Sequence, residues 1–117
     1  MQVVPQDYKY KAELEIFTLA TASAIKAAQD LIDKNPGVWY PCGFARVVIK
    51  PARGRFISML KDQNIGSTSI DGGYLITNPS KNPTQWMPAK YEGAVAFAKV
   101  LKANLPDLTF HVYERMD

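Results

Sequence analysis

A long amphipathic helix is the feature that most constrains the fold of this 117-residue sequence. Apolar residues recur at spacings of three and four from about residue 11 to residue 34, the pattern of a helix that buries one face. The stretch from Ala20 to Ala28 holds five alanines, which favour a helix and let another element approach closely. Asn35-Pro36-Gly37 ends the helix, because proline disfavours helical backbone in the residue before it. Charged residues such as Lys26 and Asp30 exclude a membrane span, which needs about 18 apolar residues.

The rest of the chain is predicted to add short strands and two further helices. We expect strands at residues 44–50, 74–77 and 108–113, and helices at residues 53–63 and 91–104. Asp71-Gly72-Gly73 favours a hairpin turn, and the polar arm before it is an edge strand or a loop. Residues 79–88 contain three prolines and are expected to form a surface loop that carries Trp86.

This order of elements predicts a single α+β domain over residues 1–117. We expect one layer of three or four mixed strands, with about three helices mainly on one face. The other face of the sheet would then be polar, a binding surface or a dimer interface.

The cysteine and histidine counts exclude two classes of small protein. One cysteine cannot form a disulfide scaffold, and one cysteine with one histidine cannot form a closed zinc site of the usual kind. We therefore expect neither a metal nor another cofactor. The first residues lack the apolar core of a signal peptide, so we expect a cytoplasmic protein without a membrane partner.

The basic residues are concentrated in one segment, although the net charge is only +3. Residues 34–61 contain six basic residues and no acidic residue, whereas the segments on either side are slightly acidic. Such a segment is a candidate surface for phosphate or another anion. The alternative is that acidic residues such as Glu13 or Asp107 neutralise the segment in the folded chain.

Within this segment, two groups of side chains are candidates for binding. Alternation along the predicted strand places Arg46 and Lys50 on its more exposed side. Arg53 and Arg55 stand where a helix begins, a place that favours anions. Nearby aromatic residues would stack bases or sugars beside these cations, or else pack over the ends of the sheet. The candidate anion- or nucleic-acid-binding residues are Arg46, Lys50, Arg53, Arg55, Lys61, Trp39 and Tyr40.

The signals for catalysis are weaker. Cys42 and His111 form the one possible cysteine–histidine pair, which a nucleophilic mechanism would need. The alternative is a buried, inert cysteine and a histidine that faces away from the core. Asp30 and Asp33 lie three positions apart on the long helix. They are either ordinary surface carboxylates or contacts of the basic segment. We assign no catalytic residue and leave open whether the protein is an enzyme, with a non-catalytic role favoured.

Three short runs, Trp39–Ala45, Lys90–Ala98 and Arg115–Asp117, carry a resemblance. They resemble small proteins of unassigned function that are encoded by tailed bacteriophages of marine bacteria. The resemblance implies a viral origin and a place in the host cytoplasm, and it transfers no functional residue.

Taken as a sequence, the chain is predicted to be a non-catalytic, oligomeric domain that binds an anion or nucleic acid through residues 46–61. The first alternative is a structural or regulatory homo-oligomer that does not bind nucleic acid. The second is a small enzyme that depends on Cys42 or handles phosphate. DNA, RNA, a small anion and an acidic protein all remain open as partners.

Overall fold

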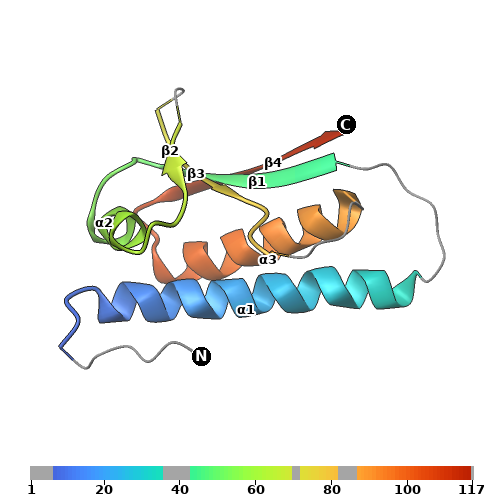
Figure 1. Ribbon diagram of the computed structural model, residues 1–117, viewed down its shortest axis with the longest axis horizontal. Helices are drawn as coiled ribbons and strands as arrows, with labels where there is room; N and C mark the ends of the chain where they lie inside the picture. The colour runs from blue at the N-terminus through green and yellow to red at the C-terminus, as the bar shows by residue number, and fades with distance from the viewer. Residues whose placement is uncertain (1–6, 36–42, 70–71, 82–86, 117) are drawn as a thin grey trace.

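A computed structural model describes residues 7–35, 43–69, 72–81 and 87–116. Within them, the chain forms three helices and a four-stranded sheet, which confirms the predicted α+β fold (Figure 1). The elements in order are α1 (Lys11–Lys34), β1 (Gly43–Lys50), α2 (Arg55–Asp62), β2 (Ser67–Thr68), β3 (Tyr74–Thr77), α3 (Met87–Asn104) and β4 (Thr109–Met116).

The strands lie in the order β2-β3-β1-β4, and all three pairs are antiparallel. The expectation of a mixed sheet is wrong on this point. After β1 the chain forms α2 and β2, and β3 then returns beside β1 in the opposite direction. In the register, Val47 of β1 is opposite Ile76 of β3 on one side and Val112 of β4 on the other.

Two layers of helix cover one face of this sheet. Helix α3 packs on β1 and β4, and α1 packs on α3, so that α3 lies between α1 and the sheet (Figure 1). The alanines of α1 allow this close packing, since Ala20, Ala24 and Ala28 are completely buried. Gly93 of α3 packs closely against this side of α1. A Cβ at Gly93 would lie only 3.1 Å from the carbonyl oxygen of Ala24. The small residues predicted to admit another element thus contact α3.

Most of the predicted boundaries agree with the structure, with one clear correction. Helix α3 begins at Met87 rather than residue 91, so Met87 and Pro88 are helical and not part of a surface loop. Proline is tolerated there because the first helical turn has no internal acceptor for its missing N–H. Pro79 and Ser80 are buried, whereas we expected an exposed loop. Trp86 lies outside the described residues.

Two smaller differences concern the ends of elements. Helix α2 is shorter than predicted, and β4 continues to Met116. None of the helices in the described part of the chain combines the length and apolar character that crossing a membrane requires.

Candidate functional site

The face of the sheet opposite the helices is bare of any described helix (Figure 1). Ala45, Val47 and Ile49 of β1 are buried in the core, so the residues that alternate with them point to the other side. This confirms that Arg46 and Lys50 share a side of their strand. We call this side the outer face; it comprises Phe44, Arg46, Val48 and Lys50 of β1, Leu75 and Thr77 of β3, and Thr109, His111, Tyr113 and Arg115 of β4.

Two aromatic rings are open to solvent on the outer face. Phe44 is 57% exposed and Tyr113 is 46% exposed. Arg46 is directly opposite Tyr113 in the register, and its guanidinium carbon lies 5.9 Å from the centroid of that ring. The His111 ring lies 6.3 Å from the same centroid. The outer face therefore presents aromatic surface and positive charge in direct contact.

The outer face is positively charged. Arg46, Lys50 and Arg115 contribute cations, and none of its residues is a carboxylate. The ion pairs formed among the described residues lie elsewhere: Lys11–Glu15, Lys26–Asp30 and Arg55–Glu13. A patch with a net positive charge attracts anions and concentrates them near the surface.

The outer face is also hollowed on both sides of Arg46 and Tyr113, which line two adjacent depressions. One, of about 360 Å³, lies toward Phe44, Arg115 and the start of α3. The other, of about 500 Å³, lies toward Lys50 and the β2–β3 hairpin. Both fall within the range of roughly 300–1,000 Å³ that is usual for small-molecule sites.

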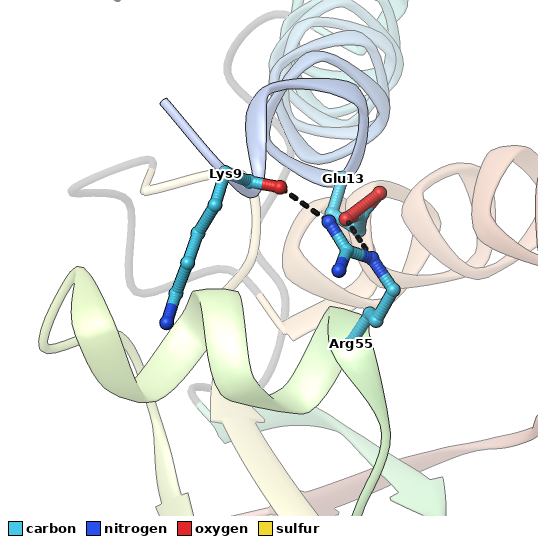
Figure 2. Close-up of polar contacts among 3 residues, drawn as sticks. All are labelled: Lys9, Glu13 and Arg55. Carbon is cyan, nitrogen blue, oxygen red and sulfur yellow. Dashed lines mark hydrogen bonds and ion pairs between the residues drawn. The ribbon is translucent and has the colours of Figure 1, made fainter. Parts of the chain in front are cut away.

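Arg55, by contrast, is neutralised by the start of α1. Figure 2 shows its Nε donating a hydrogen bond to Glu13 Oε1 at 3.0 Å, while its terminal nitrogen donates to the carbonyl oxygen of Lys9. The guanidinium also lies 5.2 Å from the centroid of the Tyr10 ring. Glu13 is one of the two acidic residues named in the sequence analysis as neutralising partners of the basic segment. It forms an ion pair with Arg55.

A second contact holds the start of α1 against α2. The Tyr8 hydroxyl donates a hydrogen bond to Asp62 Oδ2 at 2.5 Å and accepts one from Gln63 Nε2 at 2.9 Å. The hydrogen bond to the Asp62 carboxylate raises the pKa of the Tyr8 hydroxyl above its ordinary value. These contacts place Lys9 and Glu13 within reach of Arg55.

The remaining candidates do not join the outer face as one site. Arg53 and Lys61 are exposed, Arg53 just before α2 and Lys61 on it. Trp39, Tyr40 and Cys42 lie outside the described residues, so the aromatic stacking predicted for the first two and the Cys42–His111 pair stay predictions. His111 is exposed on the outer face, as its alternation with Phe110 and Val112 predicts.

The acidic candidates belong to α1 alone. Asp30 accepts a hydrogen bond from Lys26, and Asp33 accepts one from Gln29, each within one turn of the helix. Their contacts fit the interpretation of ordinary surface carboxylates.

Sequence reasoning missed four residues that now belong to the site: Phe44, Lys90, Tyr113 and Arg115. The alternation of the predicted strand 108–113 was a usable signal for Tyr113, and it would have reached Arg115 had the strand been extended past residue 113. The alternation of residues 44–50 already placed Phe44 on the same side as Arg46 and Lys50. For Lys90 no local signal existed, because α3 meets the end of β1 only in the folded chain.

Within the described residues, no three His, Cys, Asp or Glu side chains gather where they could hold a metal ion. Comparison of the chain with protein-family models, with curated proteins and with solved structures finds no match.

Proposed function

We propose that the outer face binds single-stranded nucleic acid. One observation supports this most strongly: exposed aromatic rings and three cations share a sheet face on which no described helix packs and the described residues include no carboxylate. Phe44 and Tyr113 would stack bases, and Arg46, Lys50 and Arg115 would neutralise phosphates. The proposal keeps Arg46 and Lys50 from the predicted basic segment and moves the site from α2 to the sheet.

The chemistry favours a single strand over a duplex. Stacking on an aromatic side chain contributes about 1–3 kcal/mol per base and needs a base whose face is open. In a duplex the base faces are occupied by neighbouring pairs, so only the phosphates would remain for the cations. In other proteins, four-stranded sheets bind single-stranded RNA by stacking bases on exposed aromatic residues, which supports the same use of this face.

The test is fluorescence anisotropy with labelled single-stranded and duplex oligonucleotides over a range of salt concentrations. We expect saturable binding to single strands and weaker binding to duplexes. Three phosphate contacts predict that log K falls with log salt concentration with a slope of about −2, at about 0.7 per contact.

A pair of charge-matched variants locates the site. Replacing two cations of the outer face, Arg46→Ala/Arg115→Ala, should weaken binding by roughly 10- to 100-fold and reduce the slope by about 1.4. Lys26→Ala/Lys34→Ala removes the same charge from α1 and should leave binding nearly unchanged. Absence of binding at low salt would refute the proposal, as would equal losses in both variants.

A second candidate function is a homodimer formed through β4. This eight-residue strand lies at the edge of the sheet, with β1 on one side and no described strand on the other. Edge strands readily pair with another chain, and pairing of β4 with β4 of a second copy would continue the sheet across the dimer. Sedimentation equilibrium would give a mass about twice 13.1 kDa, with no dependence on oligonucleotide.

A further inference from the structure

Lys90 is a buried cation beside the outer face. It lies in the first turn of α3 and is only 8% exposed. Its ammonium donates a hydrogen bond to the carbonyl oxygen of Gly43 at 3.0 Å and lies 5.7 Å from the centroid of the Phe44 ring. Among the described residues it forms no ion pair.

Among the described residues, the Lys90 ammonium has one hydrogen-bond acceptor, a neutral carbonyl, and no opposite charge. A lysine ammonium has three donors, and one neutral carbonyl engages only one of them. Burial of a charge is costly without an opposite charge nearby. The first turn of a helix adds to the cost, because the helix dipole places partial positive charge there. An anion beside Lys90 would relieve all three effects.

The depression of about 360 Å³ is where such an anion would sit, since Lys90 lines it. The rings of Phe44 and Tyr113 line the same depression, and so do the cations Arg46 and Arg115. Glu114 is the one carboxylate among its described lining residues, so the lining keeps a positive balance. Aromatic walls and several cations in one small cavity suit a ligand that has both a flat ring and a phosphate.

We propose that this depression binds one phosphorylated nucleotide unit, with its base against Phe44 and its phosphate beside the Lys90 ammonium. The inference rests on the proposed function and deepens it, because it names a single-nucleotide subsite within the outer face. Two sources have the same chemistry: a free nucleoside monophosphate, or one nucleotide within a bound strand.

The experiment compares adenosine monophosphate with adenosine, using the full chain and titration by isothermal calorimetry or by amide chemical shifts. We expect the monophosphate to bind at least about tenfold more tightly than adenosine. Lys90→Met keeps the apolar stem but removes the charge, and it should abolish this preference. Lys99→Met, an exposed position on the same helix, is the matched control and should retain it.

The wild-type chain decides the matter even if Lys90→Met does not fold. Adenosine monophosphate should then shift the amide signals of Gly43 and Phe44 strongly, and adenosine should shift them weakly. Equal affinity for the two ligands would overturn the subsite, as would a folded Lys90→Met variant that still prefers the monophosphate.

Oligonucleotides without terminal phosphates separate the subsite from the proposed function. If they bind more weakly to Lys90→Met, the subsite holds a nucleotide within the strand. If only the free monophosphate is affected, the subsite takes free nucleotide. If strands bind but the monophosphate preference is absent, the subsite fails and the proposed function stands. If strands do not bind at low salt, the proposed function fails.

Discussion

Two arginines of the basic segment, Arg46 and Arg55, have opposite surroundings in the fold. Arg55, at the start of α2, is held by Glu13 and by the carbonyl oxygen of Lys9. Arg46, on β1, faces the ring of Tyr113 on a sheet face whose described residues include no carboxylate. Both are arginines nine residues apart in an acid-free stretch, so the local sequence does not separate them. The difference shows that a cation in a basic run stays available for a ligand only where no other element brings an acid to it.

The largest expected effect comes from reversing the charge of Arg46 and Arg115, compared with reversing the charge of Arg55. Arg46→Glu/Arg115→Glu places two carboxylates beside the proposed phosphate positions and should weaken oligonucleotide binding by about 100-fold or more at low salt. Arg55→Glu should change binding by less than about threefold, because its charge is already neutralised by Glu13. Fluorescence anisotropy measures both. Comparable losses of affinity in the two variants would contradict the contrast between Arg46 and Arg55.

Removing an exposed ring should have the next largest effect. Phe44→Ala should weaken single-strand binding by about tenfold, since stacking contributes about 1–3 kcal/mol per base. It should scarcely change the unfolding temperature, because the ring is mostly exposed. Ile25→Ala removes an exposed apolar side chain from α1 and serves as the matched control. Unaltered binding by Phe44→Ala would leave charge alone as the basis of recognition.

The Arg55–Glu13 pair should show a small coupling in stability. Chemical unfolding of Arg55→Ala, Glu13→Gln and the double variant should give an interaction free energy of about 0.2–1 kcal/mol, as exposed ion pairs usually do. Arg46→Ala should change the free energy of unfolding by less than about 0.5 kcal/mol. A larger stability loss for Arg46→Ala would assign that residue a structural role.

A further stability effect concerns the covered side of the sheet, where the buried Tyr74 of β3 packs behind the outer face. Its hydroxyl donates a hydrogen bond to the Ile65 carbonyl oxygen at 2.5 Å, and burial raises its pKa above the ordinary value of 10.0. The stabilising contribution is therefore complete below pH 10 and declines as the pH rises above it, where the unfolded chain ionises first.

Tyr74→Phe is the variant that tests this dependence. At neutral pH it should lose about 1 kcal/mol of stability with the hydrogen bond. The difference from wild type should shrink as the pH rises above about 10, which urea unfolding at several pH values would measure. A difference independent of pH would show that burial does not hold the proton on Tyr74.

Much of the fold could be predicted because its signals are local. The periodicity of residues 11–34, the alternation of β1 and the glycines of the hairpin each fix an element through its own residues. The direction of the strands was not predictable in this way. The direction of β3 depends on where the chain returns beside β1 after α2 and β2, which no short stretch encodes.

The site was predictable only in part, for the same reason. Alternation alone placed Arg46 and Lys50 together. The neutralisation of Arg55 depends on a contact with Glu13, 42 positions away in the sequence. The burial of Lys90 depends on Gly43, 47 positions away. Contacts of this range are set by packing, so a charge count along the chain cannot separate a paired cation from an available one.

The central claim is that nucleic acid binds the outer face and not the region of α2. Amide chemical-shift mapping of the full chain with a single-stranded oligonucleotide tests it most directly. The account predicts that the largest shifts fall on Phe44, Arg46, Lys50, Tyr113 and Arg115, with little change from Arg53 to Lys61. Shifts centred on residues 53–61, with an unchanged outer face, would contradict it.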